Sequence, residues 1–180
     1  AKAVRYNTTK IFIMFMILAF VLSMFIDSIT VILFLAAITI TQSKLLQFDP
    51  IPVIIAEIFC SNLGGSSTMC GDPPNIIIGT ALHYTFTDFL TNTGVIAIIC
   101  LVLMIFFFYM CFRIKLGKRN LSEEEIEKMP TPQSAITNKR AFIISTVIFL
   151  CAVILLVTHG QTGLTVSTIG IIAAVATCIT

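Results

Sequence analysis

The chain has 180 residues, of which 57% are hydrophobic and 11% are charged, and its formal net charge is +2. Soluble domains contain roughly 45–50% apolar and about 25% charged residues, so this composition predicts an integral membrane protein in contact with lipid. The six cysteines and two histidines lie singly, without the spacing of a zinc site or of a nucleophile with its base. We therefore expect no nucleic-acid partner, no cofactor and no enzymatic activity.

The first apolar run, Ile11–Thr41, is too long for one untilted span and has polar residues at its middle. Each half has about 16 residues, or about 24 Å as a helix, which is short of the roughly 30 Å of hydrocarbon in a bilayer. This pattern predicts a re-entrant hairpin whose tip, with Asp27, Ser28 and Thr30, reaches the membrane interior. Two short full crossings remain the alternative.

The second apolar run, Pro52–Leu82, is interrupted from Ser61 to Gly79 by polar, glycine and proline residues. Lipid cannot hydrogen-bond a freed backbone, so irregular chain at membrane depth persists only inside protein or along a solute cavity. The sequence therefore predicts a broken helix that binds an ion or substrate. Its glycines allow positive φ angles and close backbone approach, and its prolines suit the first turn of the new helix. The candidate site residues of this element are Glu57, Asn62, Gly64, Gly65, Ser66, Ser67, Thr68, Gly71, Asp72, Pro73, Pro74 and Asn75.

Three acidic residues, Asp27, Glu57 and Asp72, lie at or near membrane depth, and these segments contain no basic partner. A charge at the centre of a membrane helix costs roughly 2.5–3.5 kcal/mol, so each carboxylate needs a proton or a cation. We expect a coupling proton, or sodium at Asp27 and Asp72. On a helix, Glu57 faces the same way as Ser61 and Gly64. In the alternative interpretation, Asp72 only caps a helix and Glu57 lies near the interface.

Three further apolar runs have the length of conventional transmembrane helices: Val95–Phe112, Ala141–Thr158 and Leu164–Ile179. The basic connector 113–140 separates the first of these from the other two. Within it, Ser122 and Glu125 form a capping-box pattern, which predicts a short amphipathic helix at Glu123–Met129.

A hairpin at residues 11–41 places all eleven basic residues on one side of the membrane, and the loops Leu82–Gly94 and Thr158–Gly163 on the other side contain none. Basic loops favour the cytoplasmic side, so we expect a cytoplasmic connector and a location in the plasma membrane. The predicted units are a transport unit (1–112), the connector (113–140) and the first helices of a second repeat (141–180). Because the chain begins without methionine and ends inside an apolar run, we expect a piece of a longer transporter or a truncated relative.

The segment from Asn62 to Gly79 reads Asn-Leu-Gly-Gly-Ser-Ser-Thr-Met-Cys-Gly-Asp-Pro-Pro-Asn-Ile-Ile-Ile-Gly. It resembles the signature loop of the ion transporter superfamily, closest to the ArsB/NhaD permease branch of arsenite permeases, sodium/proton antiporters and the melanosomal P protein. Residues Phe25 to Leu33 resemble the hairpin tip of that family, with Ser28 in place of the usual asparagine. The resemblance implies an all-α fold of inverted repeats, each with a re-entrant hairpin and a broken helix, and a homodimer. This chain would supply one half and the start of the second.

These features predict a secondary active transporter for a small ion. The aspartates Asp27 and Asp72 would repel a di- or tri-anion, which favours cation or proton coupling such as sodium/proton antiport. Arsenite or antimonite export stays open, because arsenous acid is largely neutral near pH 7 and needs no positive pocket. Citrate or dicarboxylate transport is a further alternative. The citrate and dicarboxylate symporters of the superfamily also resemble this chain, but they have Ser-Asn-Thr at the hairpin tip and Gly-Thr-Pro-Pro in the loop. A truncated accessory membrane subunit is the alternative outside transport.

Overall fold

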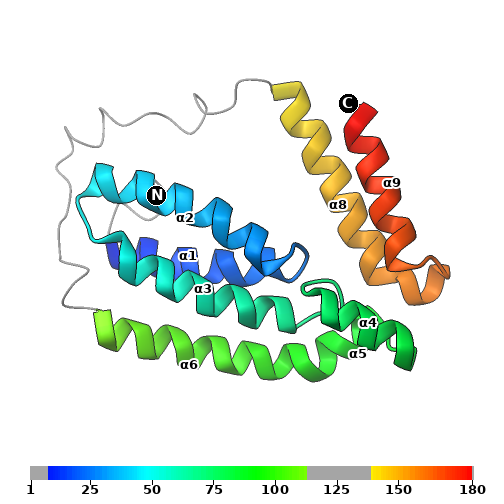
Figure 1. Ribbon diagram of the computed structural model, residues 1–180, viewed down its shortest axis with the longest axis horizontal. Helices are drawn as coiled ribbons and strands as arrows, with labels where there is room; N and C mark the ends of the chain where they lie inside the picture. Colours follow the sequence, from blue (N-terminus) through cyan, green and yellow to red (C-terminus); the bar gives the residue numbers. More distant parts are fainter. Residues whose placement is uncertain (1–7, 113–138, 180) are drawn as a thin grey trace.

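A computed structural model describes residues 8–112 and 139–179, and these residues form helices with no strand among them (Figure 1). The prediction of an all-α membrane fold is confirmed, whereas the predicted helix Glu123–Met129 lies outside the described residues. The helices are α1 (Thr8–Ser23), α2 (Ser28–Leu46), α3 (Pro50–Ser66), α4 (Pro73–Leu82), α5 (Phe86–Phe89), the π-helical segment η2 (Leu90–Gly94), α6 (Val95–Phe112), α8 (Lys139–Thr162) and α9 (Val166–Ile179).

Helix α3 is the centre of the packing, because it contacts α1, α2 and α6 (Figure 1). Helices α8 and α9 form an antiparallel pair, and α8 contacts the rest of the fold at α5 and, through Phe149, at Phe25 of the α1–α2 turn. The buried core is almost wholly apolar and comes mainly from α1, α2, α3 and α6. Its fully buried members include Phe12, Met16, Ala19, Leu35, Ala56 and Cys60.

Three helical stretches are long and apolar enough to cross a membrane: Ser28–Leu46, Phe86–Phe112 and Lys139–Thr158. Helices α1, α3 and α9 are apolar but shorter. The predicted span Val95–Phe112 coincides with α6, and the two later spans are found as α8 and α9 with shifted ends. Together with the composition, these helices make the chain an integral membrane protein.

The first apolar run folds as two helices, of 16 residues in α1 and 19 in α2. The turn between them covers residues 24–27, so Ser28 already belongs to α2 and the tip lies slightly earlier than predicted. Asp27 begins α2 as its N-cap, and its carboxylate accepts a hydrogen bond from the backbone N–H of Thr30 at 3.2 Å. Whether both helices enter from one side of the membrane stays a prediction.

The broken helix is confirmed, but its break is narrower than the predicted Ser61–Gly79 stretch. Helix α3 continues to Ser66, and α4 begins at Pro73, which leaves residues 67–72 outside the helices. The prolines Pro73 and Pro74 occupy the first turn of α4, as predicted. Proline suits that turn because its missing N–H has no partner within a helix start.

The predicted loop Leu82–Gly94 is helical from Phe86 onward, and α5, η2 and α6 form one continuous stretch to Phe112. A capping box starts it: the Thr85 hydroxyl accepts from the Asp88 N–H, and the Asp88 carboxylate accepts from the Thr85 N–H. This reciprocal bonding satisfies two N–H groups that a helix start otherwise leaves open. The loop expected there is therefore shorter than the sequence indicated.

Candidate functional site

The two interruptions of the fold meet through one side-chain hydrogen bond. Ser28, the first residue of α2, donates its hydroxyl to Oδ1 of Asp72 at 2.9 Å. Asp72 occupies the N-cap position of α4 but makes no side-chain capping bond there. The carboxylate of Asp72 therefore joins two segments that lie 44 positions apart in the sequence.

Further hydrogen bonds fix the α1–α2 turn against the end of α3 and the break. The Thr68 hydroxyl donates to the backbone carbonyl of Met24. The Ser61 hydroxyl lies 3.1 Å from the carbonyl of Ser28 and 3.2 Å from the hydroxyl of Ser23. Hydroxyls from the broken helix thus bond to backbone carbonyls of the turn and of the first residue of α2.

The start of α4 is tied back to the break by a side-chain amide. Asn75 donates from Nδ2 to the carbonyls of Gly65 at 3.2 Å and of Thr68 at 2.9 Å. The Gly71 N–H donates to the Thr68 hydroxyl at 3.2 Å, which closes the break on itself. We call the residues whose side chains make these connections the tip cluster: Ser28, Ser61, Thr68, Asp72 and Asn75.

The glycines of the break are needed for close approach. A Cβ atom on Gly64 would lie 2.1 Å from the backbone oxygen of Phe20, and one on Gly71 would lie 2.4 Å from that of Gly65. A Cβ atom on Gly65 would lie 2.6 Å from both carboxylate oxygens of Asp72. None of these three glycines has a positive φ, so of the two properties that the sequence analysis named, the fold uses close backbone approach.

Several residues predicted for the site bond within their own helix instead. Asn62 and Ser66 are exposed and donate to carbonyls of α3, at Ile58 and Leu63. The Ser67 hydroxyl is buried and donates to the Gly64 carbonyl at 2.6 Å. Three other predicted site residues, Thr30, Pro73 and Pro74, are exposed. In the described part of the chain, their side chains make no hydrogen bond to the tip cluster.

Glu57 is fully buried in the middle of α3, one helical turn before Ser61 of the tip cluster and away from the break itself. The Thr39 hydroxyl of α2 donates to its Oε1 at 2.5 Å. Nine residues separate Glu57 from the end of α3 at Ser66, which corresponds to about 14 Å along a helix. The sequence placed Glu57 on the right helix face, but the structure gives it a different partner from the break.

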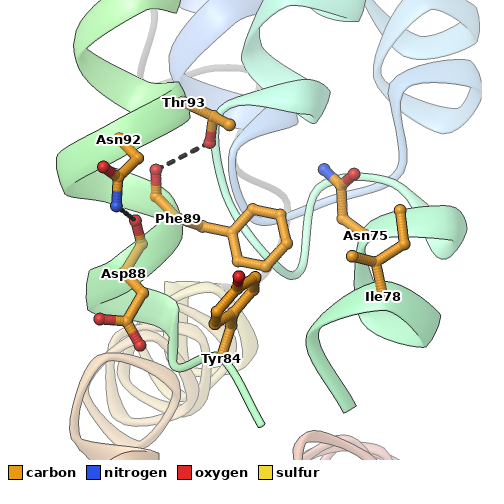
Figure 2. A pocket seen from close by; sticks show the side chains of 7 residues that line it. All are labelled: Asn75, Ile78, Tyr84, Asp88, Phe89, Asn92 and Thr93. Carbon is orange, nitrogen blue, oxygen red and sulfur yellow. Dashed lines mark hydrogen bonds between the residues drawn. The ribbon is translucent and has the colours of Figure 1, made fainter. Parts of the chain in front are cut away.

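A pocket of about 710 Å³ opens beside the break, and sequence reasoning missed it except for Asn75. Figure 2 shows its lining residues, which come from α4, the loop after it, α5 and η2: Asn75, Ile78, Tyr84, Asp88, Phe89, Asn92 and Thr93. The Thr93 hydroxyl lies 3.4 Å from the Ser67 carbonyl, so η2 packs directly against the break. π-helical turns often mark functional sites, and this one had no recognisable signal in the sequence.

The atoms that could coordinate a cation at the α1–α2 turn and at the break are oxygens. In the described ranges, no group of three or more histidine, cysteine, aspartate or glutamate side chains is close enough to hold a metal ion. Sodium bound at the tip cluster would therefore need the Asp72 carboxylate together with hydroxyls and backbone carbonyls. Carbonyls at unwound helix segments are the usual sodium ligands in transporters.

The chain is a polytopic helical membrane protein, and the polar break of its broken helix contacts the turn between two other helices. This arrangement is typical of the class of proteins that bind ions or solutes inside the membrane. Within this class, residues 1–180 match the model of the citrate transporter family. The chain belongs to that family.

The relatives include transporters and the P protein, which the sequence analysis had named in the resemblance. The chain is 32% identical to an uncharacterized transporter of Mycobacterium bovis over 105 residues, which are 58% of this chain and 24% of the relative. It is 37% identical to the magnetosome protein MamN of Paramagnetospirillum magneticum over 98 residues, or 54% and 22% of the two chains. It is 39% identical to the human P protein over 112 residues, or 59% and 13%.

These matches confirm the resemblance to the permease superfamily. The chain spans about a quarter or less of the length of these relatives. No solved structure matches the chain.

Proposed function

We propose that the protein is a secondary active transporter in which the tip cluster binds the coupling cation or proton. The hydrogen bond between Ser28 and Asp72 carries this proposal, because it brings both interruptions of the helices to one carboxylate. A carboxylate that joins two helix starts can respond to an ion by changing how those helices pack. Ion binding at such a junction is how broken-helix transporters couple an ion to movement.

The chemistry of the tip cluster favours a cation over an anion. Asp72 is negatively charged when ionised, the other members of the cluster have hydroxyl and amide side chains, and none is basic. A di- or tri-anion would meet repulsion from Asp72, whereas sodium or a proton would neutralise it. We therefore favour sodium/proton antiport.

The pocket beside the break is the proposed route of the ion or solute to the tip cluster. Among the described residues, its lining contains two amides, the Asp88 carboxylate and the hydroxyls of Tyr84 and Thr93, with no basic side chain (Figure 2). Asn75 belongs to both the lining and the tip cluster. A lining of this kind suits a cation or a neutral solute with hydroxyl groups.

Citrate transport is the second candidate, because the family is described as citrate transporters. In that case Asp72 would act by binding a cation that accompanies citrate. A sodium-citrate symporter and a sodium/proton antiporter are distinguished by the direction of proton and citrate movement. Measuring sodium, proton, arsenite and citrate fluxes on the same sealed vesicles separates the candidates.

The decisive variant is Asp72→Asn, since asparagine keeps an acceptor for Ser28 and removes the charge. Because the variant lacks the negative charge that neutralises bound sodium, we expect half-maximal flux to require roughly 10–100 times more sodium, which corresponds to about 1.4–2.7 kcal/mol of binding free energy. Asp49→Asn is the matched control, because Asp49 is an exposed N-cap that also precedes a proline. Unchanged sodium dependence in Asp72→Asn, with Asp49→Asn also unchanged, would contradict the proposed role.

A further inference from the structure

A second carboxyl group, that of Glu57, lies inside the contact between α2 and α3. Its hydrogen-bond partner is Thr39, whereas that of Asp72 is Ser28. Glu57 is 0% exposed, and so is Thr39, whose hydroxyl lies 2.5 Å from its Oε1. The other oxygen, Oε2, is also buried and has no hydrogen-bond partner among the described residues. A buried carboxyl oxygen without a partner is costly if the group is ionised.

The surroundings of Glu57 supply no charge to balance a carboxylate. The residues that α1, α2 and α6 bury in the described part of the chain include no charged or titratable side chain. On α3 itself, the titratable neighbour is Cys60, a buried thiol one turn away. Ser43, one turn from Thr39 on α2, donates its hydroxyl to the Ile40 carbonyl.

A metal cation does not fit this place. Cations such as sodium, calcium and magnesium are held by several oxygen ligands, whereas Glu57 has one hydroxyl beside it. The neighbouring side chains on the same buried faces include the apolar Leu35, Val53 and Ala56, and the hydroxyls of Ser43 and Ser61 bond to the carbonyls of Ile40 and Ser28. A single proton removes the charge and needs no further ligand.

We propose that Glu57 and Thr39 form a proton-binding site inside the α2–α3 contact, separate from the tip cluster. The proton makes Glu57 a neutral acid, which forms one hydrogen bond with Thr39 and leaves an uncharged oxygen in the apolar surroundings. Two carboxyl sites then lie on one broken-helix unit, with the cation at Asp72 and the proton at Glu57. The use of this proton in antiport rests on the proposed function, but its presence at Glu57 does not.

Infrared spectroscopy of the protein in lipid nanodiscs tests the site directly, because a protonated carboxyl has a C=O stretching band that a carboxylate lacks. At neutral pH we expect such a band in the wild type, its loss in Glu57→Gln and its presence in Asp72→Asn. Thr39→Val should shift the band to higher frequency, since the acid loses its hydrogen bond. The Thr39 variant and the pH titration of the wild-type band keep the test valid if Glu57→Gln does not fold.

A spectrum of Glu57→Gln that equals that of the wild type would overturn the site, as would loss of the band in Asp72→Asn alone. The absence of any protonated-carboxyl band in the wild type at neutral pH would also overturn it. Sodium added to the wild type then tests the coupling: antiport predicts that the Glu57 band decreases, and that it stays unchanged in Asp72→Asn. A static Glu57 band that ignores sodium would support the proton site and contradict the antiport.

Discussion

The tip cluster and the α2–α3 contact each contain one carboxyl group from the broken-helix unit, but they bury these groups differently. Asp72 is partly exposed at the start of α4 and accepts a bond from another helix. Glu57 is fully buried in the middle of α3 and has a single hydroxyl partner. A partly exposed site with several oxygen atoms can exchange a cation, whereas a closed apolar site can hold only a proton at low cost.

The difference follows from how the backbone is used in the two places. At the tip cluster, Thr68, Ser61 and Asn75 bond to backbone carbonyls of the turn, of the start of α2 and of the break. In the α2–α3 contact, both helices are regular, so their backbone groups are already paired. Side chains alone must satisfy Glu57 there. The tip cluster therefore has many possible ligands for an ion and the helix contact has few.

The strongest test of the tip cluster is Gly64→Ala, because the added Cβ would lie 2.1 Å from the backbone oxygen of Phe20. Neither helix can relieve that contact by a rotamer change, so α1 must move away from α3. Overpacking of this kind costs typically about 1–3 kcal/mol, and we expect at least the upper end in the free energy of unfolding. Thermal unfolding in detergent, followed by circular dichroism, measures the loss.

Gly170→Ala is the control for this variant, since a Cβ atom there meets nothing within 4 Å. Alanine in a helix is favoured over glycine by roughly 0.8–1 kcal/mol, so the control should be as stable as the wild type or slightly more stable. Equal stability of Gly64→Ala and the wild type would mean that α1 and α3 do not approach each other closely at Gly64. That result would contradict the geometry of the tip cluster.

The next effect concerns the buried contact. Thr39→Val keeps the shape of the side chain but leaves both oxygens of Glu57 without a donor. Leaving a buried polar group unsatisfied costs about 1–3 kcal/mol, so we expect a loss of about 2 kcal/mol in the free energy of unfolding. Thr39→Ser should restore most of it. Thr41→Val, on the exposed side of α2, serves as the control.

If Thr39→Val and Thr41→Val destabilise the protein equally, the hydrogen bond to Glu57 contributes nothing specific. The proposed difference between the buried α2–α3 contact and the partly exposed tip cluster would then be contradicted. If only Thr39→Val is destabilising, the buried contact depends on this one hydroxyl, as its geometry indicates.

A smaller effect is expected for Ser28→Ala, because Asp72 is partly exposed and water can replace the lost donor. We expect a loss of about 1 kcal/mol in the free energy of unfolding, which is the usual contribution of one hydrogen bond. Ser66→Ala is the matched control, since Ser66 is exposed and donates only to the Leu63 carbonyl of its own helix. A larger loss than that of Thr39→Val would reverse the comparison between the two sites.

The fold was predictable where apolar runs and helix-start residues act locally. The run Val95–Phe112 gave α6 with correct bounds, and Pro73 and Pro74 marked the start of α4. The helical start at Phe86 was missed, although Thr85 and Asp88 have capping-box spacing. Polar residues in this stretch resemble a loop, and only the reciprocal bonds from the backbone N–H of each residue to the side chain of the other show that a helix begins there.

The candidate site was predictable in its residue types but not in its contacts. Polar residues in a membrane helix indicate a break, and Asp72 and Asn75 were found that way. Their partners, Ser28 and the carbonyls of the break, depend on how α2 docks on α3, which leaves no local pattern in the sequence. The same holds for Thr39, a threonine within an apolar helix that became important only through Glu57.

The smallest expected effect belongs to Asp27, which the sequence places beside Asp72 as a possible sodium ligand. In the structure its carboxylate caps α2 by accepting the Thr30 N–H at 3.2 Å. Asparagine caps helices about as well as aspartate, so Asp27→Asn should change the free energy of unfolding by less than about 0.5 kcal/mol. Asp27→Ala should cost about 1 kcal/mol, because the capping bond is lost. We also expect Asp27→Asn to keep the sodium dependence of flux. A tenfold weaker dependence with unchanged stability would instead place Asp27 in the cation site and make the two interruptions equal partners in binding.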